Sequence, residues 1–288
     1  MNNNSDQDRF LPRSFVYILI GLAIVMLGAL LIGHFSHKNQ QSNSQQSKVS
    51  SVQAASDQDL LKLKWDGTLD GDIVHINGNK ATFSDEELQQ TFPAQGTTLR
   101  PTDGLALSPL DSQGRSQQAN FRVDSAAVAK VTKRPAKIPN SVRPSGWFLM
   151  DNYNGQQRVG GYHANPKVNL GGSKTSLWNK SHIVGYQFFG MPTMVTENMT
   201  TGTRVENAYP GQLDAEDDIR YALKQHPNIA IRGQVTPLYE GNDRIMRGVH
   251  YMAKSVQDNG QSLNINYWIF NVCPGVTIDY ATGKAQVQ

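Results

Sequence analysis

An apolar run near the amino terminus, Phe15 to Phe35, limits what this chain can fold into more than any other feature. It contains Tyr17 and His34 but no other ionisable side chain. As a helix, its 21 residues rise about 31 Å, which matches the roughly 30 Å hydrocarbon layer of a bilayer. A water-soluble core has no place for such a segment, so we predict a single transmembrane helix over residues 15–35.

The charges around the apolar run set its predicted orientation. Arg9 and Arg13 come just before it, and the nearest lysine after it is Lys38. Positive charges favour the cytoplasmic side, so residues 1–14 are expected to form a cytoplasmic tail and the bulk of the chain to lie outside the cell. A cleavable signal peptide is the competing interpretation, but its small-residue site at 54–55 lies too far downstream. We therefore favour a retained signal anchor.

The composition changes after the apolar run. Residues 36–57 are rich in Ser, Gln and Asn and cannot bury enough surface to offset chain entropy, so we expect a flexible linker. Residues 58–288 are long enough for one substantial extracellular domain. They contain the single cysteine, Cys273, in a strand-like run where an inert core thiol is expected. An extracellular domain without disulfides suits the surface of a Gram-positive bacterium better than a eukaryotic one.

A local excess of positive charge occupies residues 115–143, although the whole chain has a net charge of only +3. One acid, Asp124, stands among its basic residues. The basic residues of this segment are Arg115, Arg122, Lys130, Lys133, Arg134, Lys137 and Arg143. The excess favours a polyanionic partner, and a merely solvated basic surface explains it equally well.

The carboxyl-terminal part combines one helix with several strands. A helix is predicted from Ala215 to about Gln225, with Asp214 as its cap and one apolar stripe. The runs 229–239, 246–256 and 263–272 are typical of successive strands. The fold class is therefore predicted as α+β, with an antiparallel sheet.

Shorter patterns precede this region. Residues 74–83 predict short strand pieces around an Asn-Gly turn, and a brief helix is expected to begin at 84–87. Residues 147–163 predict two strands around a turn at 152–155. These strands lead towards a segment that ends at His182.

Among seven histidines, His182 is the strongest candidate for chemistry. It is followed by Asn198, Asn207 and Glu216. An imidazole can deprotonate a water near neutral pH, and oxygen ligands from Asn and Glu suit a hydrated magnesium ion. On spacing alone, a hydrogen-bonded structural histidine is the more common case. The other histidines flank the apolar run, stop the helix, lie in strand patterns or lack nearby ligand residues: His34, His37, His226, His75, His250 and His163.

Two central motifs, residues 177–187 (LWNKSHIVGYQ) and 197–207 (ENMTTGTRVEN), resemble the DNA/RNA non-specific endonuclease family of the ββα-metal, or His-Me finger, superfamily. Within it, the chain is most similar to membrane-bound DNA-entry nucleases and secreted streptococcal-type DNases. The resemblance implies a nuclease core in which an antiparallel sheet and a metal-site helix hold one ion, here preceded by the single transmembrane helix. Similarity extends to residues 76–80, 108–111, 144–147 and 274–280.

The resemblance implies a role for each matching side chain. His182 would be the general base that activates the attacking water, and Asn207 would bind the catalytic Mg²⁺ directly. Glu216, on the following helix, would orient waters around the metal, and Arg220 would stabilise the charged transition state. Taken alone, Glu216 and Arg220 also fit an i,i+4 pair of the kind found on helix surfaces, and Asn207 also fits a turn residue.

Other motif positions are expected to contact the substrate or support the loop. Asn198 and Arg204 match positions that support the loop or touch phosphate. Many family members have Asp-Arg-Gly-His where this chain has Asn179, Lys180 and Ser181 before the histidine. Lys180 is expected to take the arginine's catalytic place, and Asn179 to lie near the substrate. Lysine cannot make the bidentate phosphate contact that arginine makes, so weaker binding or a lower rate is expected.

The sequence therefore predicts a membrane-anchored endonuclease that needs Mg²⁺, with Mn²⁺ as a substitute ion, and cuts extracellular DNA without sequence preference. RNA is an alternative substrate, because recognition through phosphates leaves no base-reading motif. The competing prediction is a catalytically weak or inactive surface module that binds DNA for capture or import. A scaffold protein with neither property ranks last, and the sequence identifies no protein partner.

Overall fold

The computed structural model describes much of the chain that follows the predicted anchor. The described residues are 51–54, 56–82, 99–102, 104–147, 152–153, 156–157 and 165–288. The chain divides after Val49, and the described residues belong to its second unit, Ser50–Gln288. The predicted tail, the transmembrane helix, most of the linker, His163 and the helix expected at 84–87 lie outside the described residues. No helix within the described part is long and apolar enough to span a membrane.

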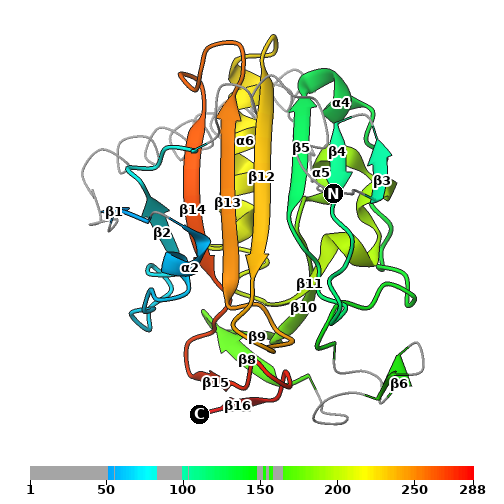
Figure 1. Cartoon of the computed structure of the whole chain (residues 1–288), viewed down its shortest axis with the longest axis vertical. Helices are drawn as coiled ribbons and strands as arrows, with labels where there is room; N and C mark the ends of the chain where they lie inside the picture. The colour runs from blue at the N-terminus through cyan, green and yellow to red at the C-terminus, as the bar shows by residue number, and fades with distance from the viewer. Residues whose placement is uncertain are drawn as a thin grey trace, which may run out of the picture. The chain divides into compact units, whose positions relative to one another are not determined.

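An eight-stranded sheet forms the centre of this unit (Figure 1). In spatial order its strands are β1 (Ser51–Val52), β2 (Ile73–Ile76), β14 (Asn264–Phe270), β13 (Gly248–Ser255), β12 (Ala230–Leu238), β5 (Ala119–Asp124), β4 (Leu105–Leu107) and β3 (Leu99–Thr102). Neighbouring strands are antiparallel except β1 and β2, which are parallel. The three strands predicted from the carboxyl-terminal runs are confirmed as β12, β13 and β14.

One long helix, α6 (Gln212–Gln225), lies behind the central strands in Figure 1. Its predicted apolar stripe is confirmed, and it joins the main core. The helix begins earlier than predicted, at Gln212 after Gly211, and Asp214 lies in its first turn instead of capping it. An added Cβ at Gly211 would lie 2.2 Å from the carbonyl oxygen of Glu206, so the chain packs too tightly there for a capping side chain. The buried apolar residues of the stripe are Ala215, Ile219, Ala222 and Leu223.

Strand pairs and short helices complete the unit. The pairs are β6 (Asn152–Tyr153) with β7 (Gln156–Gln157), β8 (Lys167–Leu170) with β9 (Ser173–Ser176), β10 (Trp178–His182) with β11 (Met199–Thr203), and β15 (Val276–Ile278) with β16 (Ala285–Val287). The helices are α2 (Asp57–Leu60), α4 (Ser125–Ala129), α5 (Tyr186–Phe189) and the 3₁₀ turns η1 (Met191–Thr193) and η2 (Thr196–Asn198). The order β10, β11, α6 is the strand, strand, helix arrangement that the resemblance implies.

The shorter sequence patterns are confirmed in part. An antiparallel pair, β6 and β7, is present where two strands were predicted. However, β6 occupies residues 152–153, which were predicted to belong to the turn. The Asn-Gly turn after β2 is present, and Asn77 and Gly78 have positive φ angles of 52° and 66°. The piece that follows, as far as residue 82, is not a strand. Cys273 is a free and buried cysteine, as expected for a core thiol.

An aromatic cluster connects the sheet to α5. The ring of Phe121, on β5, stacks on Phe188 with centroids 6.0 Å apart and meets Tyr251, on β13, edge-on at 6.4 Å. Gly233, on β12, leaves room for the Phe121 ring, since an added Cβ would lie 2.0 Å from its Cζ. The cluster therefore holds α5, and with it the chain that follows His182, against the sheet.

We predict that Gly233→Ala lowers the free energy of unfolding by about 1–3 kcal/mol, because the new methyl group must displace the Phe121 ring. Chemical denaturation followed by tryptophan fluorescence measures the change. Arg122→Ala, an exposed change on the neighbouring strand, is the control and should stay within about 0.5 kcal/mol of wild type. A Gly233→Ala protein as stable as wild type would show that the ring does not rest on this glycine.

Candidate active site

His182 is the last residue of β10 and lies opposite Met199 of β11. Its side chain is buried, with 7% of its surface exposed. Burial lowers the pKa of its imidazole to about 3, and the positive charge of Arg134 acts in the same direction. Its Nε2 has no hydrogen-bond partner among the described residues. The ring is therefore neutral at physiological pH, and a neutral imidazole keeps a lone pair on one of its nitrogens.

Asn198 holds the loop that follows His182. Its amide oxygen accepts the N–H of Val184 at 3.0 Å, and its amide nitrogen donates to the carbonyls of Val184 and Thr193 at 2.9 and 3.1 Å. The backbone carbonyl of Asn198 accepts the N–H of Ile183 at 2.9 Å. The Asn198 side chain is fully buried, so the amide is used within the loop. Of the two roles expected for this residue, the geometry supports loop support rather than contact with phosphate.

Glu216 projects from α6 towards the same loop. Its carboxylate accepts hydrogen bonds from the side-chain amides of Gln187 at 2.7 Å and Gln212 at 3.3 Å. Burial raises the pKa of Glu216 to about 7, and the hydrogen bond from Gln212 opposes that rise. An added Cβ at Gly185 would lie 2.5 Å from Glu216 Oε1. The chain just beyond His182 therefore packs directly against this carboxylate.

Gln212 joins the end of β10 to the start of α6. Its Nε2 donates to the backbone carbonyls of His182 and Ile183, the second at 3.1 Å. Its backbone N–H donates at 2.6 Å to the carbonyl of Glu206, the residue before Asn207. Asn207 is half-buried. These bonds bring the predicted base, the loop of the predicted metal ligand and the acid of α6 into one connected unit.

The side chains of β10 divide between two faces, because successive residues of a strand point to opposite sides. Lys180 shares a face with His182. Asn179 and Ser181 point the other way, and Ser181 donates to the fully buried Glu206 at 3.3 Å. Burial raises the pKa of Glu206 to about 8. Asn179, which was expected near the substrate, therefore lies on the face opposite the candidate base. Ser181, on the same face as Asn179, has the buried Glu206 as its partner.

Lys180 is partly occupied by contacts within the protein. Its Nζ donates to the carbonyl of Pro139 at 3.2 Å and lies 5.3 Å from the centre of the Trp147 ring. Burial lowers the pKa of Lys180, and the charge of Arg143 lowers it further. The ammonium group is thus held beside an aromatic face, on the same side of the strand as His182.

Arg220 and Arg204 are exposed. Arg220 pairs with Asp217, three residues before it, and its side chain is 51% exposed. The i,i+4 pair with Glu216 considered from the sequence is not formed; the carboxylate of Glu216 is instead held by amides. Arg204 directly follows β11. Both arginines remain accessible to a long charged substrate.

Two arginines of the basic segment 115–143 act electrostatically on the site. Arg134 affects the pKa values of both His182 and Glu216, and Arg143 affects that of Lys180, in each case beside a larger effect of burial. The sequence did not distinguish these two from the other basic residues of the segment, because nothing in their spacing differs. Gln187 and Gln212 were also missed, since a glutamine carries no sequence signal for such contacts.

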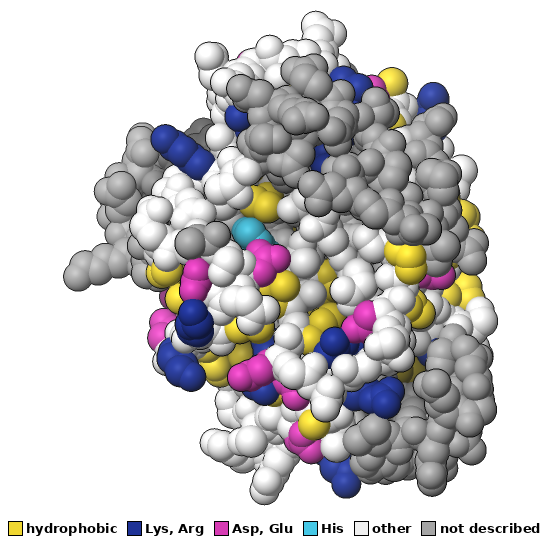
Figure 2. Space-filling model, viewed as in Figure 1, with side chains coloured by type: hydrophobic (Ala, Val, Ile, Leu, Met, Phe, Trp, Pro, Cys, Tyr) yellow, Lys and Arg dark blue, Asp and Glu magenta, His cyan; other side chains and the backbone are white. Residues whose placement is uncertain are grey.

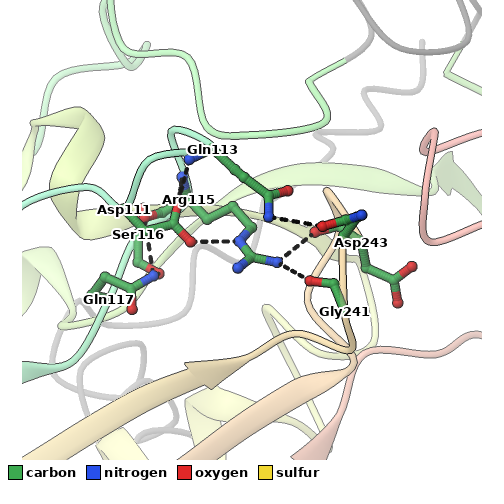
Figure 3. Close-up of polar contacts among 8 residues, drawn as sticks. Asp111, Gln113, Arg115, Ser116, Gln117, Gly241 and Asp243 are labelled. Carbon is green, nitrogen blue, oxygen red and sulfur yellow. Dashed lines mark hydrogen bonds and ion pairs between the residues drawn. The ribbon is translucent and has the colours of Figure 1, made fainter.

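Arg115, from the same segment, has a structural role (Figure 3). It pairs with Asp111 at 2.7 Å, and its guanidinium donates to two backbone carbonyls of the loop 241–243 at 2.9 and 3.1 Å. Its neighbour Ser116 donates to the carbonyl of Met199 at 2.5 Å. The segment that contains Arg115 and Ser116 is therefore bonded to the start of β11, opposite the candidate base.

The described surface carries charges of both signs. On the face shown in Figure 2, basic and acidic side chains are interspersed, and no patch of one sign covers it. The small net charge of +3 agrees with this mixture. Attraction of a polyanion is therefore expected to depend on the cations around His182 more than on the charge of the whole unit.

Asn207 and Glu216 carry oxygen donors of the kind that suits a hydrated divalent cation. Within the described part of the chain, no group of three or more His, Cys, Asp or Glu side chains is placed to hold a metal ion. Asn207 offers a neutral amide oxygen and Glu216 a buried carboxylate, and both are hard donors. An ion that keeps most of its water needs few protein ligands, so the chemistry of these two residues is compatible with a hard divalent ion.

Comparisons with known proteins agree with this arrangement. Residues 149–257 match the model of a family described as DNA/RNA non-specific endonuclease. The structure of Sda1 nuclease with bound zinc ion is similar, with a TM-score of 0.55 and 23% identity over 65% of this chain and 82% of that one. The structure of NucA from Streptococcus agalactiae with magnesium bound has a TM-score of 0.52 and 24% identity, over 75% of this chain and 87% of that one. The structure of the same protein without metal has a TM-score of 0.53 and 22% identity, over 82% of this chain and 97% of that one. No curated protein matches the chain.

The structural likeness, at these identities, concerns the fold, and it confirms the predicted α+β class. The family match concerns the site, because residues 149–257 include β10, β11 and α6. These elements carry His182, Asn207 and Glu216. Residues 149–257, which carry the candidate site, therefore match the DNA/RNA non-specific endonuclease family.

Proposed function

We propose that this protein is a metal-dependent endonuclease that hydrolyses phosphodiester bonds of extracellular DNA without sequence preference, with RNA as a second substrate. One observation carries the proposal. A buried, neutral imidazole, with one nitrogen unpaired among the described residues, is hydrogen-bonded through its backbone to a helix that carries a buried carboxylate.

His182 is the proposed general base. Its neutral ring accepts the proton of the water that attacks phosphorus, and a positioned base of this kind contributes about 10²–10⁴-fold to the rate. The loop held by Asn198 and the bond from Gln212 restrain the backbone at His182 and just after it. Little reorientation is then needed when the substrate binds.

Asn207 is the proposed metal ligand, through its amide oxygen, and Glu216 is proposed to orient the surrounding water. When bound, the ion stabilises the negative charge that develops on the phosphate oxygens. Mg²⁺ is the proposed ion, with Mn²⁺ as a substitute, because hard oxygen donors suit both. The magnesium in NucA and the zinc in Sda1 support a divalent ion in this fold.

Positive side chains around the base are proposed to hold the substrate backbone. The charge of Arg134 acts on His182, and that of Arg143 acts on Lys180. Arg204 and Arg220 are exposed. Cations of this kind neutralise phosphates without reading bases. The transmembrane helix proposed for residues 15–35 would keep the enzyme at the outer surface of a Gram-positive cell, where it meets extracellular DNA.

The first prediction tests the base. His182→Ala is expected to lower the rate of plasmid cleavage in Mg²⁺ by at least about 100-fold, while a gel shift in EDTA shows unchanged DNA binding. His226→Ala, at an exposed histidine, is the matched control and should cleave as wild type does. Equal rates for His182→Ala and wild type would reject the assignment. A wild-type protein that shifts DNA but shows no metal-dependent cleavage would be the DNA-binding module.

The second prediction tests the metal ligand. Asn207→Ala should raise the Mg²⁺ concentration at half-maximal cleavage by at least about tenfold, because an amide oxygen that binds the ion is lost. The measurement is a cleavage rate over a Mg²⁺ titration. Asn228→Ala, at an exposed asparagine beyond α6, controls for the general effect of the substitution. An unchanged Mg²⁺ requirement in Asn207→Ala would exclude this residue as a ligand.

The third prediction uses the raised pKa of Glu216. Burial moves this pKa from 4.5 to about 7, so the folded state loses stability as the pH rises from about 4.5 to about 7 and the buried carboxyl ionises. Glutamine does not ionise. In metal-free buffer at pH 8, Glu216→Gln should therefore be more stable than wild type, by an upper bound on the order of 3 kcal/mol, and this gain should vanish near pH 4.

Thermal unfolding of both proteins over this pH range measures the difference, and cleavage assays on the same samples measure activity. Glu216→Gln should be the less active protein, because its side chain no longer carries the charge that orients water. A variant that is less stable than wild type at pH 8 would contradict the burial of an ionisable acid at this position.

A further inference from the structure

Gln212 is the first residue of α6, and its side chain is 3% exposed. Its Nε2 donates to the backbone carbonyls of His182 and Ile183 and to Oε1 of Glu216. Its backbone N–H donates to the carbonyl of Glu206, next to Asn207. One residue thus contacts the chain segments of the base, the acid and the metal ligand.

The chemistry of these contacts requires a hydrogen-bond donor. All three atoms around the Nε2 are acceptors, two carbonyl oxygens and one carboxylate oxygen. Carbonyl oxygens cannot donate, so only a side chain with N–H or O–H groups can satisfy them. A glutamate at position 212 would place one carboxylate against another, and a methionine of similar length would offer no donor.

Gln212 links two parts of the site, the strand β10 and the helix α6, which belong to different layers of the fold. β10 and β11 form a separate two-stranded sheet, whereas α6 packs on the eight-stranded sheet. Glu216 lies one helical turn after Gln212, on the same face of α6. The amide therefore bridges the strand that carries His182 and the helix face that carries Glu216.

We propose that Gln212 is a positioning residue for phosphodiester cleavage, which sets the placement of His182 relative to α6 through its side-chain amide. This inference rests on the proposed function of His182 and Glu216. Gln212 does not touch the reacting atoms, and its effect passes through His182 and Glu216. A misplacement of about 1 Å can lower a rate by about 100-fold, so loss of the amide should reduce turnover much more than substrate binding.

A purely structural role predicts something different. A buried amide that only stabilises the fold would lower the melting temperature, while the folded molecules would cleave at the wild-type rate. Leu223→Ala is the matched control, because Leu223 is a buried core residue near the opposite end of α6. It should lower the melting temperature more than Gln212→Met does and leave kcat within about twofold of wild type.

The experiment compares wild type, Gln212→Met and Leu223→Ala at a temperature where all three are folded. It measures kcat and KM on plasmid DNA in saturating Mg²⁺, together with melting temperatures. Gln212→Met is expected to lower kcat by about 10–100-fold, with KM within about threefold. An unchanged kcat, or a loss no larger than that of Leu223→Ala, overturns the proposal.

A second variant covers the case in which Gln212→Met does not fold. Gln212→Asn keeps an amide but shortens its reach by one methylene group, and it is judged by the same criterion. If neither variant folds, the side chain is required for folding and the positioning role is overturned. Absence of metal-dependent cleavage in wild type would instead reject the proposed function itself, whereas active wild type with equally active Gln212 variants rejects only this inference.

Discussion

Hydrogen bonds between the end of β10 and the first turn of α6 are the constraint on which the site depends. The strand and the helix belong to different layers, so the main-chain ladder of the large sheet does not set their separation. The Gln212 amide bridges the two elements directly, and the aromatic contact of Phe121 with Phe188 holds the intervening α5 against the sheet. The hydrogen bonds from the Gln212 amide and the apolar packing of Phe121 on Phe188 together keep the candidate base beside α6.

Burial then decides the charge state of the groups so placed. Desolvation disfavours the charged form of every ionisable side chain, so it keeps the His182 imidazole neutral and raises the pKa of Glu216 to about 7. Two glutamine amides oppose the second effect by donating to the carboxylate. Such an arrangement reduces the stability of the fold, and strongly shifted pKa values are characteristic of functional sites.

Much of the architecture could be predicted because it follows from local periodicity. The runs that became β12, β13 and β14, and the apolar stripe of α6, carry their period in the sequence itself. The start of α6 could not be predicted, since Asp214 has the better capping side chain, yet close packing at Gly211 decided the boundary. Competition between local preference and tertiary packing explains that error.

In the candidate site, too, some features follow from the local sequence and others from tertiary packing. The candidate residues for the chemistry, and the family that the motifs resemble, were evident in the segments around His182 and Asn207. The partners of Arg220 and Asn198 were not, because an arginine can reach an acid either three or four residues away and a buried asparagine can bind either loop or ligand. Side-chain geometry settles such choices, and it depends on the surrounding packing.

The sequence by itself determined the strands β12, β13 and β14 and the apolar stripe of α6, which family the motifs resemble, and which side chains are candidates for base and metal ligand. These properties depend on residue type and on spacing along the chain. Only the tertiary structure decided that His182 is buried and neutral, that Asn179 faces away from it, and that Gln212 bridges β10 and α6. Desolvation and hydrogen bonding act between atoms that are close in space, and here those atoms come from segments far apart in the sequence.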